Sequence, residues 1–336
     1  MGVACDSHFY SISIPFCKLL SMAALMPKVK KALKYLLITG LLLIAVIGIW
    51  GYASDLSVEE LKEKYGQPPS QYLAMNGMEV HYRIEGQGDT LLLLHGTAAS
   101  LHTWDRWAES LKSDFTIIRL DLPAFGLTGP HPEAKYSLEA YDSFVNDFMN
   151  ALGAERFSIA GNSLGGAIAW HYAAQHPERM EKLILLDPSG LPKDGSTSLI
   201  FRLAKNPVSA ALLKKLTPRS IIADNLKQVY HDDSKVTDEL INRYRDMTRR
   251  TGNRQAFVDR ANNTGGVDAR ALLESIQCPT LIQWGRHDTW IPVSDAALFE
   301  SYIANSRSII YENAGHVPME EIPKETAADV RKFLLE

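Results

Sequence analysis

A serine flanked by glycines at the end of an apolar segment is the feature that most constrains how this chain can fold. The stretch reads Gly161-Asn162-Ser163-Leu164-Gly165-Gly166. Residues 156–160 before it are apolar enough for a buried strand, and residues 167–174 after it are rich in helix formers. We therefore predict a strand that turns into a helix at Ser163, with small flanking residues because the two elements pass close together.

A corner of this kind carries chemistry. It holds the serine in a strained backbone conformation and leaves its Oγ exposed at the start of a helix. The N–H of Leu164 lies in the first helical turn, where it has no partner inside the helix and can stabilise an oxyanion. The pattern predicts Ser163 as a nucleophile and Leu164 as an oxyanion donor. An ordinary glycine-rich turn is the alternative interpretation of the motif taken alone.

Segments typical of strands alternate with helical segments along most of the chain. The predicted strands are 78–84, 90–94, 115–120, 156–160, 180–186, 279–284 and 308–311, and the predicted helices include 104–111, 137–152, 295–303 and 323–335. This alternation indicates an α/β domain with a mostly parallel sheet covered by helices on both faces. Residues 191–275 break the alternation, because their apolar residues recur at helical spacing. They predict a helical cap between two parts of the sheet domain, 78–190 and 276–336.

The N-terminal part contains an uncharged apolar run, residues 35–52, preceded by Lys28, Lys30, Lys31 and Lys34. As a helix the run spans about 27 Å, so we expect a transmembrane anchor with the N-terminus in the cytoplasm and the catalytic domain exported. Cleavage of a signal peptide near Ala53 is the alternative and gives a secreted or periplasmic protein. A buried core helix is disfavoured because the run is apolar all round. Residues 1–34 are interpreted as an extension with a basic flank, and residues 53–77 as a linker.

Charge and cysteine content exclude several classes of partner. The net charge of -4, without a basic stripe, argues against binding to nucleic acid. The three cysteines, Cys5, Cys17 and Cys278, are spaced for neither a zinc site nor a disulfide framework in the sheet domain. Since a dinucleotide fingerprint and a metal-ligand motif are both absent from the sequence, we expect no cofactor and no metal.

Polar motifs follow several of the predicted strands. In chain order they are His95-Gly96-Thr97, Asp121 to Gly126, the serine motif, Gly285-Arg286-His287-Asp288 and Gly315-His316. The carboxyl ends of parallel strands meet at one edge of a sheet, so these motifs are predicted to converge there. Asp288 and His316 are the candidate acid and base for Ser163. Asp187, which ends the strand before the cap, is the alternative acid, and Asp121 and the other histidines are expected to be structural.

On these motifs the chain resembles the α/β-hydrolase superfamily from Met78 to Leu335, and within it the capped branch of serine esterases, lipases and carbon–carbon hydrolases. The resemblance implies an α/β-hydrolase fold with an inserted cap, a triad of Ser163, His316 and Asp288, and Thr97 as the second oxyanion donor. Ala124 stands where that branch more often has glycine. Serine at position 163 excludes the dehalogenases and epoxide hydrolases of the fold, which attack with aspartate.

The function that this resemblance implies is hydrolysis of a small, hydrophobic carboxylic ester through an acyl-enzyme. Carbon–carbon bond hydrolases share the G-N-S-x-G-G motif, but they usually carry a tryptophan soon after the histidine, where this chain has Val317-Pro318-Met319. A catalytically inactive binding protein is the third possibility, which the ordered triad disfavours. The cap arginines (Arg243, Arg245, Arg249 and Arg250) are interpreted as a solvated helix face, with binding of an anionic substrate as the alternative.

Overall fold

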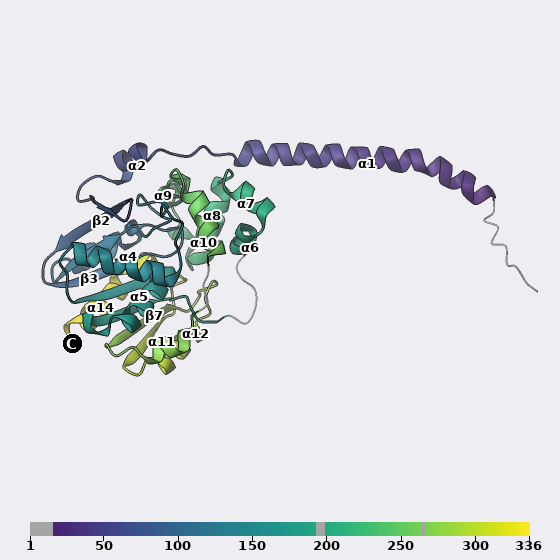
Figure 1. The fold of residues 1–336 in the computed structure, drawn as a ribbon. Coiled ribbons are helices and arrows are strands. Elements are labelled where there is room, and N and C mark those ends of the chain that lie inside the picture. Colours follow the sequence, from purple (N-terminus) through teal and green to yellow (C-terminus); the bar gives the residue numbers. More distant parts are fainter. Residues whose placement is uncertain (1–15, 193–198, 264–266) are drawn as a thin grey trace, which may run out of the picture. The chain divides into compact units, whose positions relative to one another are not determined.

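The computed structural model describes residues 16–192, 199–263 and 267–336 (Figure 1). The chain divides into two compact units, residues 1–50 and residues 51–336. The predicted N-terminal extension therefore lies partly outside the described residues, as do two short segments of the predicted cap. All the candidate site residues lie in the second unit.

Helix α1 (Phe16–Gly51) contains the apolar run that the sequence predicts to cross a membrane. In the described ranges, no helix combines the length and the apolar character that crossing a bilayer requires. The predicted transmembrane helix over residues 35–52 is therefore not supported. The helix ends at Gly51, the first residue of the larger unit, where backbone pairing within that unit begins: Thr217 N–H donates to Gly51 O (2.9 Å) and Ala53 N–H donates to Lys215 O (3.2 Å).

An eight-stranded sheet forms the centre of the larger unit, in the order β1-β2-β4-β3-β5-β6-β7-β8. The first two pairings are antiparallel and all the others are parallel, which confirms the predicted mostly parallel sheet. The strands are β1 (Gln71–Met75), β2 (Met78–Gly86), β3 (Asp89–Leu94), β4 (Phe115–Leu120), β5 (Phe157–Asn162), β6 (Met180–Leu186), β7 (Thr280–Gly285) and β8 (Ser306–Tyr311).

The order of the strands creates a crevice at the carboxyl edge. After β3 the chain moves to β4 on one side and then returns to β5 on the other side. Leu94 at the end of β3 pairs with Gly161 near the end of β5. Loops that leave neighbouring strands in opposite directions open a ligand crevice at this point. The loop after Leu94 and the corner at Ser163 therefore lie side by side.

Helices cover both faces of the sheet, as the sequence predicts. On one face lie α4 (Leu138–Ala151), α5 (Leu164–Gln175), α11 (Ala269–Glu274) and α12 (Ser294–Tyr302). On the other face lie α3 (Asp105–Leu111), α13 (Pro318–Glu321) and α14 (Pro323–Leu335). Helix α4 illustrates why: its buried residues recur at helical spacing, and Ser137 Oγ accepts a hydrogen bond from Ala140 N as the predicted N-cap.

A group of helices between β6 and β7 forms the cap (Figure 1). They are α6 (Leu199–Lys205), α7 (Pro207–Leu213), α8 (Arg219–Val229), α9 (Asp238–Arg249) and α10 (Asn253–Asn262). The predicted cap segment also contains α11, but α11 packs on the sheet domain, because its Leu273 is fully buried in the core beside α5. The cap thus ends before α11.

Residues 53–77 are folded, although the sequence suggested a linker. Helix α2 (Val58–Tyr65) begins with a capping box between Ser57 and Glu60. Its Leu61 is buried against Leu127 of the sheet domain and Met247 of the cap. Leu56, Tyr65 and Tyr72 pack against the same cluster, so the segment is fixed across the seam between sheet and cap by several apolar contacts.

Candidate active site

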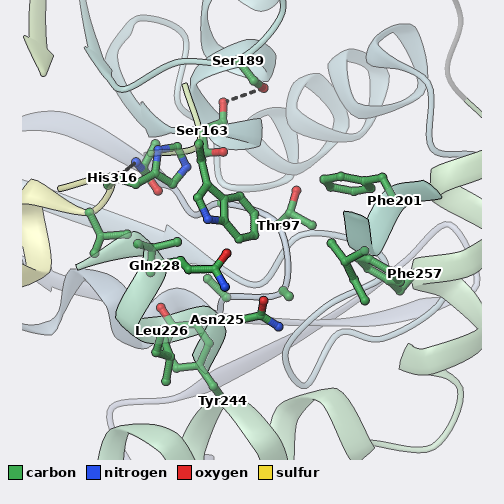
Figure 2. Close-up of a pocket in the computed structure, with 18 of the residues that line it drawn as sticks. Thr97, Ser163, Ser189, Phe201, Asn225, Leu226, Gln228, Tyr244, Phe257 and His316 are labelled. Atoms are coloured by element: carbon green, nitrogen blue, oxygen red, sulfur yellow. Dashed lines mark hydrogen bonds between the residues drawn. The ribbon is translucent and has the colours of Figure 1, made fainter. Parts of the chain in front are cut away.

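Ser163 lies at a forced corner between β5 and α5. Its φ of 54° and ψ of -112° place a residue with a side chain in a region that favours glycine. A Cβ on Gly161 would approach Gly165 O to 2.1 Å, and one on Gly165 would approach Leu94 O to 2.1 Å. Only glycine fits these two positions, because strand and helix pass almost in contact. The predicted strand-to-helix corner is present, and Ser163 lines the main cavity (Figure 2).

His316 and Asp288 are hydrogen-bonded to each other beside this corner. His316 Nδ1 lies 2.6 Å from Asp288 Oδ2, and the other carboxylate oxygen, Oδ1, accepts from the backbone N–H groups of Trp290 (2.7 Å) and Ile291 (2.9 Å). Both side chains are almost fully buried. With Nδ1 facing Asp288, Nε2 is the ring nitrogen left for a second partner. His316 lines the same cavity as Ser163, and the two lie close together in Figure 2.

The backbone of His316 is anchored on two sides. Its N–H donates to Val229 O at the end of cap helix α8 (2.7 Å), and its carbonyl accepts from Asn162 Nδ2 (2.9 Å). The indole of Trp290 stacks on the imidazole with ring centres 5.9 Å apart. The histidine is therefore held by the residue before the serine and also by the cap.

The loop after β3 lies directly against Ser163. A Cβ on Gly96 would come within 3.3 Å of Ser163 Cβ, and Thr97 lines the cavity. Leu164 is the first residue of α5, so its N–H has no partner within the helix. Both predicted oxyanion donors are thus brought next to Ser163. Fully buried His95 supports the loop: its Nδ1 donates to Gly96 O (2.7 Å) and its Nε2 accepts from Leu122 N–H (3.0 Å).

Asp187, the alternative acid, lies behind the triad. It is fully buried, and its Oδ1 accepts from Gly285 N–H (3.0 Å), while Oδ2 has no hydrogen-bond partner. Burial and the nearby Asp288 carboxylate raise the pKa of Asp187 well above its usual value, which favours its protonated form. The hydrogen bond to His316 comes from Asp288. The structure thereby places Asp288 in the position that a triad acid occupies.

A metal ion is the other group that the buried acids and the histidine beside Ser163 could hold. Asp187, Asp288 and His316 place potential ligand atoms within 4.8 Å of one another, the one such cluster among the described residues. However, His316 Nδ1 and Asp288 Oδ2 are in direct hydrogen-bond contact at 2.6 Å. An ion bridging these two atoms would have to separate them, because metal–ligand distances of about 2.0–2.2 Å place two ligand atoms further apart. The residues therefore fit a hydrogen-bonded dyad better than a metal centre.

The cavity in front of Ser163 has a volume of about 700 Å³ and is mostly apolar. Its wall opposite the sheet comes from the cap, where Phe201 of α6 and Phe257 of α10 stack with ring centres 5.8 Å apart. Leu226 of α8 lines another side (Figure 2), and Trp290 is also among the lining residues. No aspartate or glutamate is among the described residues that line it. A cavity of this size and character suits an apolar organic substrate.

Two buried glutamates connect the cap to the triad, and sequence reasoning missed them. Glu320 accepts hydrogen bonds from Tyr230 (2.7 Å) and Tyr244 (2.7 Å) of the cap and from Thr103 of the sheet domain. Glu321 accepts from Gly315 N–H (2.7 Å), next to His316, and from two N–H groups of the loop after α8. No local pattern in the sequence marks the partners of these two glutamates.

The cap arginines are not a free cationic surface. Arg243 lies 3.8 Å from Glu320. The other three donate to backbone carbonyls: Arg245 to Thr217, Arg249 to Ser54 and Arg250 to Thr128. The expected solvated helix face is therefore a set of contacts, of which that of Arg245 lies within the cap and those of Arg249 and Arg250 join the cap to its surroundings. A role in binding an anionic substrate is not supported for these four.

Together, the parallel sheet, the forced serine corner and the serine–histidine–aspartate arrangement define a hydrolase of the α/β fold. A sequence profile of the alpha/beta hydrolase fold matches residues 89–323. The chain belongs to the α/β-hydrolase family, and this confirms the resemblance predicted from the motifs.

Three curated relatives show the range of this family. An uncharacterised protein of Mycobacterium tuberculosis is 31% identical over 282 residues, which cover 80% of this chain and 81% of that protein. The 2-hydroxy-6-oxo-6-phenylhexa-2,4-dienoate hydrolase of Comamonas testosteroni is 26% identical and covers 70% of this chain and 84% of its own. A monoacylglycerol lipase of Bos taurus is 26% identical, with coverages of 74% and 76%.

Among solved structures, a membrane phospholipase A described as a bacterial virulence factor superposes with a TM-score of 0.67 at 27% identity. The match covers 94% of this chain and 97% of that one. Relatives of this chain thus include enzymes named for ester hydrolysis and enzymes named for cleavage of dienoates.

Proposed function

We propose that this protein hydrolyses hydrophobic carboxylic esters through an acyl-enzyme formed on Ser163. The observation that carries the proposal is the placement of Ser163, at a strained corner, on the same apolar cavity as a hydrogen-bonded His316–Asp288 pair. A serine hydroxyl needs an adjacent base to attack a carbonyl, and His316 presents its free ring nitrogen to that cavity.

The mechanism follows from these positions. His316 takes the proton of Ser163 Oγ as the oxygen attacks the ester carbonyl, and Asp288 keeps the imidazole in the required tautomer and stabilises its charged form. The N–H groups of Leu164 and Thr97 receive the negative charge on the carbonyl oxygen. Each such donor contributes about 3 kcal/mol to stabilising the transition state. His316 then gives the proton to the leaving alcohol, and a water activated by the same histidine releases the acid.

Cleavage of a carbon–carbon bond is the second candidate, and the dienoate hydrolase relative favours it. Two observations favour esters instead. The cavity wall is mostly apolar, and the solved structure compared above, whose match covers 94% of this chain, is named as a phospholipase. In addition, no tryptophan closely follows His316, whereas carbon–carbon hydrolases that share the G-N-S-x-G-G motif usually carry one there.

The proposal is tested with the purified protein, a fluorophosphonate probe and p-nitrophenyl esters of increasing acyl length. We expect labelling of Ser163 and turnover that rises with chain length until the cavity is filled. A 2-hydroxy-6-oxo-dienoate is the comparison substrate. Faster turnover of the dienoate than of every ester would favour the carbon–carbon reaction. An absence of labelling and turnover would favour an inactive binding protein.

We further propose that the catalytic unit is exported. Four lysines precede the apolar run of α1, and acidic residues follow it, which is the charge asymmetry of a segment with a cytoplasmic N-terminus. Leu33, Leu36, Leu37 and Leu42 of α1 are exposed within their unit.

Reporter fusions after Glu336 test the side of the membrane. Alkaline phosphatase should be active there, and green fluorescent protein should be dark. Carbonate washing and N-terminal mass then separate a retained segment from one cleaved near Ser54. Intact protein in the cytoplasmic fraction would contradict both forms of the proposal.

A further inference from the structure

The outer helices of the cap carry a concentrated positive charge, although the chain as a whole is slightly acidic. Residues 199–223 contain five cations and no acid, whereas the whole chain has a net charge of -4. Arg219 is paired with Asp238. Arg202, Lys205, Lys214 and Lys215 form no ion pair with the described residues. Four unneutralised cations are thus concentrated on two short helices and the turn after them.

Exposed apolar side chains lie among these cations. Val208 and Leu212 of α7 are 76% and 53% exposed. They are four residues apart, so they occupy one face of the helix, one turn from each other. Tyr52, which is 61% exposed, pairs with Leu216 just beyond α7. Leaving large apolar side chains in water is unfavourable, and a group of them rimmed by charges marks an interaction surface.

This surface adjoins the mouth of the catalytic cavity. Leu199 and Lys205 of α6 both line the cavity and are exposed to solvent, so they lie at its rim. Helix α6 packs against α7, and Phe201 of α6 lies on the inner wall (Figure 2). Whatever contacts the outer side of α7 is therefore placed next to the opening that leads to Ser163.

We propose that Tyr52, Val208 and Leu212, with the cations around them, form a docking face for an anionic lipid bilayer and bring the cavity rim to the lipid. Apolar side chains enter the interface between headgroups and acyl chains, and each lysine or arginine near an anionic surface adds about 1 kcal/mol. A second copy of the chain fits less well, since a two-fold contact would place the same cations opposite one another. This inference rests on the proposed hydrolysis of lipid-like esters.

The test uses the full chain and two substrates. One substrate is p-nitrophenyl butyrate in solution, and the other is a monoacylglycerol in phosphatidylcholine vesicles with or without phosphatidylglycerol. Val208→Asp/Leu212→Asp should reduce the rate on anionic vesicles by about tenfold or more, because it replaces apolar anchors with charges that the membrane repels. The rate on the soluble ester should stay unchanged, since neither residue lines the cavity.

Two further variants separate a loss of membrane docking from a general loss of activity. Leu298→Asp alters another exposed leucine, 43% exposed on α12, and should leave both rates unchanged. Lys214→Gln/Lys215→Gln should lower only the rate on anionic vesicles, and added salt should reduce the wild-type rate on them. If Val208→Asp/Leu212→Asp also loses turnover of the soluble ester, the docking proposal is tested by Lys214→Gln/Lys215→Gln instead.

Three outcomes would overturn the inference. The first is equal rates of wild type and both cap variants on anionic vesicles. The second is no preference for anionic vesicles over neutral ones. The third is a dimer that the variants dissociate without any vesicle effect, which would assign the face to a second copy. If wild type cleaves neither ester, the proposed function fails, while co-flotation with vesicles still tests docking: the variants must float less than wild type.

Discussion

The carboxyl edge of the sheet and the outer helices of the cap differ in how tightly their residues are held. At the sheet edge, four non-glycine residues have positive φ values: Ala98 (61°), Ala124 (84°), Ser163 (54°) and Asp187 (43°). Such conformations persist only where the surrounding packing imposes them. By contrast, the fully buried residues of the apolar cluster that joins α6, α7 and α10 are all small, namely Ala204, Ala210, Val258 and Ala261, and the larger Phe201, Leu213 and Phe257 are only partly buried against them.

This difference separates chemistry from selection of the substrate. The buried sheet edge stabilises one geometry of the triad, because any shift there breaks several hydrogen bonds in a dry environment. Small side chains bury little apolar area, so α6 and α7 are held with less free energy than the strands. We infer that substitutions at the edge change kcat, whereas substitutions in α6 change which ester is preferred. Four predictions test this difference, in order from the largest expected effect to the smallest.

The largest effect is expected at Ser163. Ser163→Ala should abolish ester turnover and probe labelling, because no other side chain replaces the nucleophile, while thermal stability stays close to wild type. Ser163→Gly should be equally inactive but more stable by about 1 kcal/mol, since glycine adopts positive φ without strain. Thermal melts and initial rates measure both. Residual turnover above about one per cent of wild type would contradict the assignment of the nucleophile.

The second-largest effect on activity is expected at Asp288, the candidate acid of the triad. Asp288→Asn should lower kcat on the order of 10⁴-fold, because an amide cannot hold the imidazole tautomer or stabilise its cation. The backbone contacts to Trp290 and Ile291 can be kept by the amide oxygen, so the fold should persist. Stopped-flow or steady-state rates with a p-nitrophenyl ester check this. A fall of less than about tenfold would show that another group serves as the acid.

In the cap, Phe201→Ala should change selectivity. Removing the ring that stacks on Phe257 enlarges the cavity, so short acyl chains lose contacts and longer chains gain room. We expect kcat/KM for short esters to fall about tenfold, mainly through KM, with the optimum moved to longer chains. The acyl-length series measures this. A uniform fall in kcat at every chain length would contradict the separation between edge and cap.

The smallest effect on activity is expected at Asp187. Asp187→Asn keeps an acceptor for Gly285 N–H and a neutral group beside Asp288, so kcat should stay near wild type. Stability should change with pH. The folded protein keeps a proton on Asp187, because its pKa is raised, whereas the unfolded chain releases it above about pH 4. This difference destabilises the wild type at pH 7 and vanishes as the pH falls towards 4.

Thermal melts across this pH range check the sign. Asp187→Asn should melt higher than wild type at pH 7, and the two curves should converge near pH 4. The reverse trend, with a variant that is less stable at neutral pH, would mean that Asp187 is ionised in the folded protein. A loss of kcat as large as that of Asp288→Asn would make Asp187 the triad acid.

Sequence patterns failed where a segment's role depends on distant partners. The predicted transmembrane helix over residues 35–52 is not supported, and the predicted linker is folded because Leu61 finds a buried site between sheet and cap. The sequence predicts that the four cap arginines form a solvated helix face, but the groups that they contact, Glu320 and three backbone carbonyls, lie outside their own helix. The composition of such segments gives their charge and polarity, but it does not show which distant residues they contact.

The sequence by itself determined the alternation of strands and helices, the corner at Ser163 and the candidate residues of the triad, with Asp288 and Asp187 both possible as the acid. These are local properties, since glycine spacing and a serine between a strand and a helix restrict the backbone wherever they occur. Only the tertiary structure decided which acid faces His316, because Asp187 and Asp288 both end strands at the same edge. It also decided the roles of Glu320 and Glu321 and the composition of the cavity wall. Those depend on packing between residues far apart in the chain, and periodicity and motifs do not encode such contacts.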